Sequence, residues 1–314
     1  VLLALSKTYG IFMRPDDAHI SNESAIEIYQ KLGDQLGFAN ALAQMAEINI
    51  QQLIYDEAQK FTLRSMPIFK DFHDALGNAR CQSLLAQIEL AHCQLDNAMT
   101  LAEQAFEQYK KTDKFNAQVD LSIFIGTVQT YQNKVDMAQA SLNQAEMLLD
   151  IHQSNASRPE LYNAMGLLYE CRGDFANADR YYRMAQDTAQ SMEYLEQVYV
   201  ARMNVIKVNM FFTPGRWYYD ELLKIANESR TYGLKNAQIH ALLFIVWFEG
   251  VYGEQRTWEN LMGELTRFVQ IQRLPVQGLL RRFEFDVDVL KYVGADLSAA
   301  LRRSAGWIRQ YLCP

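Results

Sequence analysis

The sequence predicts an all-α solenoid built from antiparallel helix pairs. Three observations lead to this fold class. The first two are that small residues recur every 40 residues over the first 190 residues and that no segment has the alternating pattern of a strand. A third is that mostly apolar residues beside the small ones follow the spacing of a buried helix face. We therefore expect helices throughout the chain, with one helix pair in each repeat.

The 40-residue period is clearest at three positions that hold only Ala, Gly or Ser. The position in the second helix is Ala18, Ala58, Ala98, Ala138 and Ala178. The position twelve residues earlier is Ser6, Ala46, Ala86, Gly126 and Gly166, and the position seven residues later is Ala25, Ser65, Ala105, Ala145 and Ala185. Because small side chains let two helix backbones approach closely, these positions predict where the two helices of a pair cross.

Short polar segments separate the expected helices. Arg172-Gly173-Asp174 is the expected turn within the fifth pair, and Gln132-Asn133-Lys134 is its counterpart in the fourth. The segments between pairs are 32–37, 74–78, 112–114 and 154–159. Their Gly, Asn, Asp and Pro residues favour helix ends and turns.

The repeat pattern weakens after residue 190. We therefore divide the chain into regular repeats at 1–190 and degenerate helix pairs with C-terminal capping helices at 191–314. Residues 198–229 still indicate a helix pair, whose second helix is displaced by about two residues from the 40-residue register. Another pair is expected with its turn near 252–254, followed by two helices at 276–313.

The fifth repeat resembles the tetratricopeptide repeat (TPR) family. The matching residues are Tyr162, Met165-Gly166, Tyr169, Ala178, Tyr182 and Ala185. The period of 40 residues exceeds the family's usual ~34, and such long repeats resemble those of bacterial regulators such as MalT-like activators and Rap-type response-regulator phosphatases. The resemblance implies a right-handed superhelix whose first helices line a concave, partner-binding side.

The family offsets place a set of polar, amide-rich side chains on that concave side. The candidate partner-binding residues are Asn40, Glu47, Gln51, Arg80, Gln87, Thr127, Tyr131, Glu160, Asn163 and Glu170. Some family members bind a C-terminal carboxylate with Lys and Asn, but here Ala43 and Glu47 stand at those offsets. We therefore expect the concave side to bind side chains or a helix of another protein or peptide, or of an effector domain of the same chain.

No residue pattern predicts catalysis, a cofactor or a metal. The five histidines are scattered without a pair at i, i+4, and there is neither a glycine-rich phosphate loop nor a GxSxG motif. The acidic residues of the fifth repeat are explained by a solvated helix face. We therefore expect no enzymatic activity, no cofactor and no metal site.

Composition excludes several other classes of function. The net charge is −7, and residues 1–210 contain 17 Lys and Arg against 26 Asp and Glu, which disfavours nucleic-acid binding. No apolar run approaches the ~20 residues of a membrane span. Four cysteines without paired spacing indicate reduced thiols and a cytoplasmic setting. We interpret the start VLLALSKTYG, which has no Met, as a cut from a longer protein.

All four tryptophans lie in the last third of the chain, at Trp217, Trp247, Trp258 and Trp307. One interpretation is that bulky residues close the end of the helix stack, because the end of a solenoid must be capped. The other is an aromatic contact surface. Its residues would be Phe211, Phe212, Trp217, Tyr218 and Tyr219.

Three functions are consistent with these features. The leading hypothesis is a protein-interaction module, the sensing or partner-binding part of a bacterial signalling or transcription regulator whose effector domain lies outside this sequence. The second is a Rap-like regulator that acts on a phosphorylated response regulator, although the sequence offers no clear residue to orient a water molecule. The third is a structural scaffold or dimerisation module that forms a homodimer.

Overall fold

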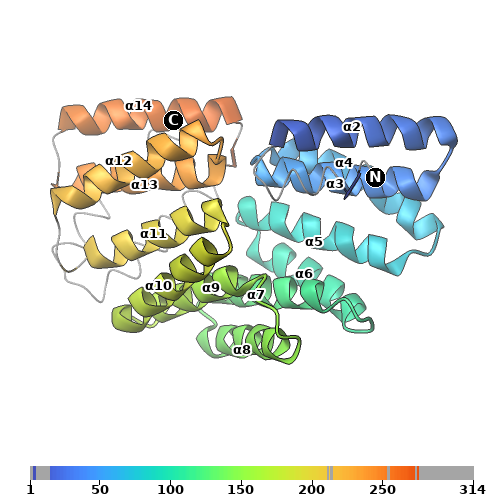
Figure 1. The fold of residues 1–314 in the computed structure, drawn as a ribbon, viewed down its shortest axis with the longest axis horizontal. Coiled ribbons are helices and arrows are strands. Elements are labelled where there is room, and N and C mark those ends of the chain that lie inside the picture. Colours follow the sequence, from blue (N-terminus) through green and yellow to red (C-terminus); the bar gives the residue numbers. More distant parts are fainter. Residues whose placement is uncertain are drawn as a thin grey trace. The chain divides into compact units, whose positions relative to one another are not determined.

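The computed structural model describes residues 3–4, 15–210, 212, 215–252, 255–272 and 274–275. Within these ranges there is no strand, and the predicted all-α fold class is confirmed (Figure 1). The helices are α2 (Pro15–Leu32), α3 (Gln35–Gln51), α4 (Tyr55–Asp71), α5 (Ala75–Ala91), α6 (Leu95–Tyr109), α7 (Phe115–Tyr131), α8 (Val135–Ile151), α9 (Arg158–Cys171), α10 (Phe175–Ser191), α11 (Leu195–Met210), α12 (Arg216–Thr231), α13 (Lys235–Tyr252) and α14 (Gln255–Gln272).

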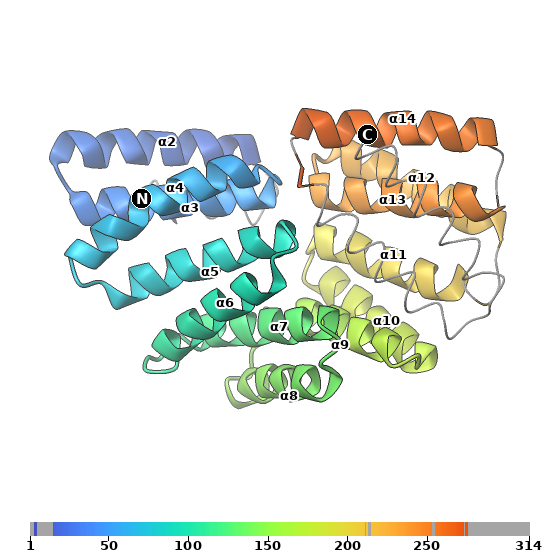
Figure 2. The same ribbon diagram turned by 180° about the vertical axis from the view of Figure 1, so that it is seen from behind.

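The chain forms two compact units, which we call unit 1 (residues 1–121) and unit 2 (residues 122–314). The boundary falls inside α7, so that unit 1 contains α2 to α6 with the first part of α7. Unit 2 contains the rest of α7 with α8 to α14. Figures 1 and 2 show that consecutive helices lie side by side within each unit.

Each unit is assembled from helix pairs. In unit 1, α3 packs on α4 and α5 packs on α6, while in unit 2 the pairs are α9 with α10, α11 with α12, and α13 with α14. The first helices of neighbouring pairs also contact each other: α3 contacts α5, and α11 contacts both α9 and α13. This is the arrangement of a helical solenoid.

The small residues lie where the sequence places the helix crossings. The five alanines of the second-helix position are all fully buried. A Cβ atom added at Gly166 would lie 2.5 to 2.8 Å from three ring carbons of Tyr182, and one at Gly126 would lie 2.7 Å from Leu142. An added methyl group at either place would require the facing side chain to shift, so glycine lets the helices approach this closely. Ser6 lies outside the described residues.

The 40-residue register continues past residue 190. The turn between pairs has a residue with positive φ at Gly33, His73, Gln153, Glu193 and Gly233, which are separated by multiples of 40. A left-handed residue at this place ends a helix and lets the chain turn back. The turns therefore keep the repeat where the sequence pattern weakens.

The expected displacement of the sixth pair's second helix is wrong. Helix α12 starts one residue later than α10 shifted by 40, and it ends in register with it. Tyr218 and Ile225 occupy the places of Ala178 and Ala185 and are buried like them. Because larger residues stand at the small-residue positions here, the sequence pattern does not show the 40-residue register, but the structure retains it.

In the last described pair α13 ends at Tyr252 and α14 begins at Gln255, on either side of the turn expected near 252–254, of which residues 253–254 lie outside the described residues. In this pair Val246 and Trp258 occupy small-residue positions of the register and are buried. The two helices expected at 276–313 lie outside the described residues.

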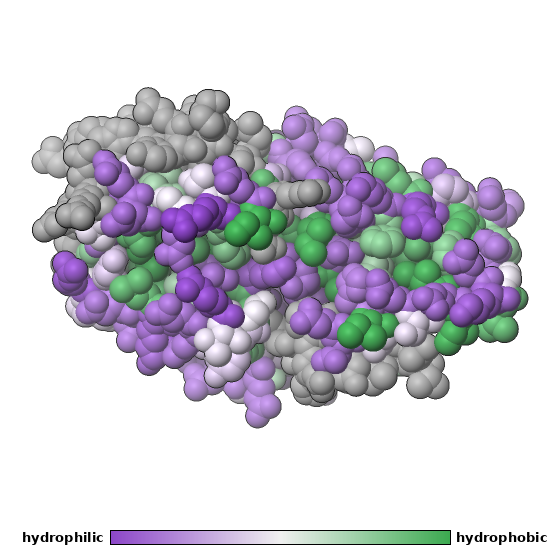
Figure 3. All heavy atoms as spheres, turned by 90° about the horizontal axis from the view of Figure 1, so that it is seen from above, coloured by the Kyte–Doolittle hydropathy of each residue, from purple (hydrophilic) through white to green (hydrophobic). Residues whose placement is uncertain are grey.

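The surface of the described residues is mixed in character. Figure 3 shows hydrophilic and hydrophobic residues interspersed on one face of the molecule. Within the described ranges, no helix combines the length and the apolar character that crossing a membrane would require.

Candidate functional site

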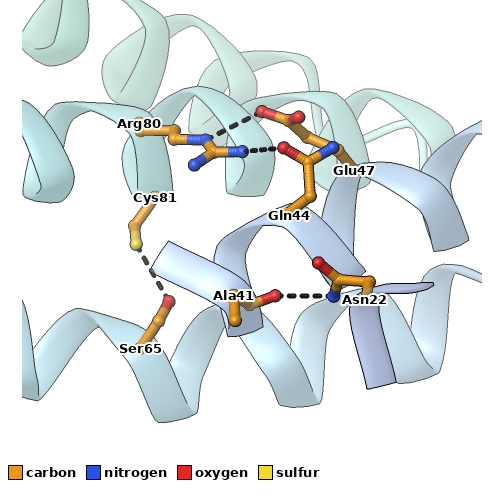
Figure 4. A network of polar contacts seen from close by, with 7 residues as sticks. All are labelled: Asn22, Ala41, Gln44, Glu47, Ser65, Arg80 and Cys81. Carbon is orange, nitrogen blue, oxygen red and sulfur yellow. Dashed lines mark hydrogen bonds and ion pairs between the residues drawn. The ribbon is translucent and has the colours of Figure 1, made fainter. Parts of the chain in front are cut away.

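The candidate residues of unit 1 lie on α3 and α5, the first helices of two neighbouring pairs. Arg80 of α5 donates from Nε to Oε1 of Glu47 at 2.8 Å and from Nη2 to Oε1 of Gln44 at 2.9 Å. Figure 4 shows Gln44 and Glu47 on α3 turned toward the guanidinium group of Arg80. One arginine therefore links two consecutive repeats on this side of unit 1.

The Arg80 pair is only partly withdrawn from solvent. The side chains of Arg80 and Glu47 are 25% and 32% exposed. Burial acts to lower the pKa of Arg80, but the charge and hydrogen bond of Glu47 outweigh it and raise the pKa above its usual value. Burial also raises the pKa of Tyr109, although the charge of Arg80 acts to lower it.

Two more hydrogen bonds join neighbouring helices beside this pair (Figure 4). Asn22 of α2 donates from Nδ2 to the carbonyl oxygen of Ala41 at 2.8 Å, and the Ser65 hydroxyl lies 3.2 Å from the Cys81 thiol. Burial raises the pKa of Cys81, which keeps its sulfur in the unreactive thiol form. These contacts fix the helices that position Arg80.

The other candidates of unit 1 differ in exposure. Gln51 and Gln87 are exposed, whereas Asn40 is half-buried and donates from Nδ2 to the carbonyl oxygen of Leu36 in its own helix. Gln44, Glu47 and Gln51 follow the i, i+3, i+7 spacing of one helix side. We call the side formed by Gln44, Glu47, Gln51, Arg80 and Gln87 the first-helix face of unit 1.

In unit 2 the candidates of α9 bond to α11, the first helix of the next pair. Gln197 donates from Nε2 to Oε1 of Glu160 at 3.0 Å. Asn204 donates from Nδ2 to Oδ1 of Asn163 at 3.2 Å. These half-buried and buried amides and carboxylates link consecutive repeats, as Arg80 does in unit 1.

Glu170 has a different environment from the other candidates. Its carboxylate accepts from Nζ of Lys207 at 2.8 Å, and the two side chains are 0% and 3% exposed. The Lys207 ammonium group also lies 5.8 Å from the centre of the Phe244 ring on α13. A partner therefore cannot reach Glu170 in this structure.

The α7 candidates complete the predicted set. Thr127 is half-buried, and its hydroxyl donates to the carbonyl oxygen of Ile123 at 2.9 Å. Tyr131 at the end of the helix is half-buried as well. Neither residue has a charged group that could hold a charged ligand by itself.

Comparisons with known proteins give matches to solved structures. No family model matches the chain, and no curated protein matches it. A Rap protein solved in complex with competence and sporulation factor is 14% identical to this chain. The match covers 99% of this chain and 97% of the Rap chain, with a TM-score of 0.65. The Rap conjugation gene regulator of plasmid pLS20, solved with the Phr* peptide, is also 14% identical, with 90% and 77% covered and a TM-score of 0.66.

Two further solved structures share the architecture. Aspartyl phosphate phosphatase F from Bacillus subtilis is 16% identical, with 90% of this chain and 74% of that chain covered and a TM-score of 0.60. A signal transduction ATPase of Pyrococcus horikoshii with a tetratricopeptide repeat sensor is 15% identical, with 98% and 47% covered and a TM-score of 0.56. The chain has a TPR-like helical repeat fold. Identities this low establish the fold and leave function to the residues.

Within the TPR-like fold, register explains the burial of Glu170. Gln51 and Tyr131 are separated by two periods, and Glu170 stands one residue earlier in the repeat. Thr130 occupies the same place as Glu170 and is also fully buried. One residue along a helix is a rotation of ~100°, which is enough to turn a side chain from the surface into a helix contact.

Sequence reasoning missed the partners on the next first helix, above all Lys207. This residue stands in the same place of the register as Glu47, Gln87 and Thr127. Continuing the 40-residue period beyond residue 190 would have identified it. The loss of the small residues in that region removed the evidence for doing so.

The described residues offer binding groups but no cluster for metal chemistry. Among them, no three His, Cys, Asp or Glu side chains lie together in a way that could hold a metal ion. The first-helix face of unit 1 instead presents amide, carboxylate and guanidinium groups. Such groups can recognise the polar groups of a peptide or protein.

The aromatic alternative divides into exposed and buried residues. Phe212 and Trp217 are 57% and 59% exposed, whereas Tyr218 and Tyr219 are buried on the inner side of α12. Phe211 lies outside the described residues, as does Trp307. Trp247 and Trp258 are buried, which is the environment expected of residues that close a helix stack.

Proposed function

We propose that this chain is a protein-interaction module that binds a peptide or another protein, as the partner-binding part of a bacterial regulator. The main supporting observation is the row of polar side chains on neighbouring first helices, exemplified by Arg80 between Glu47 and Gln44. Side chains held by bonds between repeats keep their positions before a partner arrives, so little ordering entropy is lost on binding. The proposal places the chain in the cytoplasm.

The solved structures that share the fold support a peptide or protein as the partner. Two of the Rap structures that share the fold were solved with bound peptides, namely competence and sporulation factor and Phr*. A first-helix face with amides at regular spacing fits the backbone and side chains of such a ligand. A domain of the same chain could occupy this face in a longer protein.

A capture experiment followed by affinity measurement tests the proposal. Proteins and peptides retained by the purified chain from host lysate would be identified, and the affinity of the retained ligand measured by calorimetry. The test variant is Gln87→Arg, at an exposed position of the first-helix face. The control is Gln104→Arg, at a glutamine that is also exposed and lies on α6, the second helix of the same pair.

We expect Gln87→Arg to weaken binding about tenfold or more, since an added long cation must be desolvated or displaced. Gln104→Arg should bind like the parent chain. Equal affinity of all three proteins would reject the first-helix face as the binding surface. Capture of no ligand at all would reject the interaction module itself.

A Rap-like action on a phosphorylated response regulator is the second candidate. It is favoured by the shared fold with aspartyl phosphate phosphatase F. Release of inorganic phosphate from phosphorylated response regulators of the host, with and without the purified chain, separates the two candidates. Faster release of phosphate would support a Rap-like action on the response regulator. Binding without faster release would support an interaction module alone.

A further inference from the structure

Helix α8 exposes a stripe of apolar side chains on its outer side. Met137, Met147 and Ile151 are 55%, 55% and 64% exposed, and Ala140 and Gln144 between them are also exposed. We call these five residues the α8 stripe. In Figures 1 and 2 no other helix of unit 2 lies across the side of α8 turned away from α7 and α9.

The α8 stripe has the spacing of a helix-packing seam. Its residues are separated alternately by three and four positions, as in the a and d places of a heptad repeat. The opposite side of α8 is also apolar, because Ala138, Leu142, Ala145 and Leu149 are fully buried in unit 2. A helix that is apolar on two opposite sides is expected to be buried on both.

The α8 stripe is unusual among the second helices that the structure describes. At the five corresponding places of the 40-residue register, each of the other described second helices has at least one charged residue. Examples are Glu27 in α2, Lys60 in α4, Glu107 in α6, Asp187 in α10, Lys224 in α12 and Glu264 in α14. Charged outer sides keep the other helices in solvent, whereas the α8 stripe has no charge at all.

We propose that the α8 stripe is a homodimer contact in which α8 packs antiparallel against α8 of a second copy. In a two-fold symmetric contact each residue must complement its counterpart on the same patch of the other copy. With the axis at Gln144, Ala140 lies opposite Met147 of the second copy, and Met137 lies opposite Ile151. On both sides of the axis the small Ala140 then meets the long Met147, which lets the helices approach closely there.

Gln144 favours this pairing. It is the sole polar residue of the α8 stripe, and the two-fold axis places it against Gln144 of the second copy. Two carboxamide groups can donate and accept one hydrogen bond each, so neither is left unsatisfied at the contact. Parallel pairing would place Ala140 against Ala140 and leave a gap between a layer of methionine and a layer of glutamine.

The size of the contact sets the expected affinity. The stripe extends over 14 residue steps, or about 21 Å of helix, which is less than a standard protein interface requires. We therefore expect a weak dimer with a dissociation constant on the order of micromolar to tens of micromolar. Because each chain has a net charge of −7, dimerisation should strengthen when salt screens the repulsion.

Sedimentation velocity of the full chain over about 1 to 200 µM tests the proposal. The test variant is Met147→Lys, which places a charge in the α8 stripe. The matched control is Asn227→Lys, at the corresponding place of the register on α12, where the asparagine is exposed. The parent and the control should shift from monomer to dimer with concentration, and Met147→Lys should sediment as a folded monomer at every concentration.

Cysteine cross-linking tests the antiparallel arrangement. Under mild oxidation Gln144→Cys should form a covalent dimer, because its two copies face each other at the axis within disulfide distance. Met137→Cys alone should not cross-link, but a mixture of Met137→Cys and Ile151→Cys should, with the parent chain as the control for its native cysteines. A parent chain that stays monomeric, a dimer that withstands Met147→Lys, or self-cross-linking of Met137→Cys would overturn the proposal.

Discussion

At the crossing of α5 and α6 in unit 1, two fully buried alanines face each other's helix, Ala86 and Ala102. In unit 2, the same two places at the crossing of α9 and α10 are taken by Gly166 and Tyr182. The glycine removes one methyl group from the first helix, and the tyrosine adds an aromatic ring to the second, which packs directly against the glycine. One 40-residue register therefore accommodates two packing solutions, two small residues or a glycine beneath a large ring.

The units also differ in how they bury charge. Arg80 and Glu47 in unit 1 retain about a quarter to a third of their side-chain exposure. Lys207 and Glu170 in unit 2 have almost none. A partly exposed pair contributes little because water competes with it, while a buried pair exacts a large penalty when one member is lost. Three of the following predictions test these two differences, and one tests a polar contact within unit 2.

The largest effect on the free energy of unfolding is expected for Lys207→Met. This change leaves the carboxylate of Glu170 buried without its ammonium partner, which should reduce the free energy of unfolding by about 3–5 kcal/mol. Urea denaturation followed by circular dichroism measures the loss. The double variant Lys207→Met with Glu170→Leu should recover most of it, and a single-variant loss below about 1 kcal/mol would contradict the burial of the pair.

Gly166→Ala should have the next largest effect on the free energy of unfolding. The added methyl group would meet the ring of Tyr182 at 2.5 to 2.8 Å, so the helices must separate or the ring must move. We expect a loss of about 1–3 kcal/mol in the free energy of unfolding. In a Tyr182→Ala background the same substitution should be neutral or stabilising, because alanine favours the helix over glycine by about 1 kcal/mol. Additive losses would show that the two residues do not share the crossing.

Tyr199→Phe tests a polar contact between the two helices of the sixth pair, α11 and α12. The Tyr199 hydroxyl donates to Oε2 of Glu228 at 2.9 Å, and burial together with this bond raises its pKa from 10.0 to about 12. The folded chain therefore favours the protonated phenol. The resulting stabilisation is complete below pH 10 and is lost as the pH rises through about 12.

At neutral pH, removing the hydroxyl should cost about 1 kcal/mol of unfolding free energy. Between pH 10 and about 12, stability should fall less steeply in Tyr199→Phe than in the parent. Urea denaturation at a series of pH values compares the two slopes. Equal slopes would mean that Tyr199 titrates alike in the folded and unfolded chains.

Arg80→Gln should have the smallest effect on stability. Glu47 remains partly in contact with solvent, so losing its partner should cost less than about 1 kcal/mol. The same urea titration provides the measurement. A loss comparable to that of Lys207→Met would mean that unit 1 buries its charge pair as strongly as unit 2 does, and the contrast between the units would fail.

The sequence predicted the helix pairs well because the small residues required at helix crossings recur at a fixed period that can be read directly from the sequence. It predicted the candidate site less completely. Glu170 was assigned to the surface on family offsets, but it is fully buried against Lys207. The burial of a charged residue depends on which side chains cover it, and those residues belong to helices that lie 37 or more positions away in the chain.

The sequence by itself determined the helical character, the 40-residue period and the places where alanine and glycine permit close crossings. These are local properties, since helix periodicity and side-chain size act at each residue. The tertiary structure alone decided that the register continues under Tyr218 and Ile225 and which polar groups pair across repeats. It also decided that the apolar outer side of α8 is left exposed. Those features depend on the packing of distant helices, which residue patterns within one helix cannot specify.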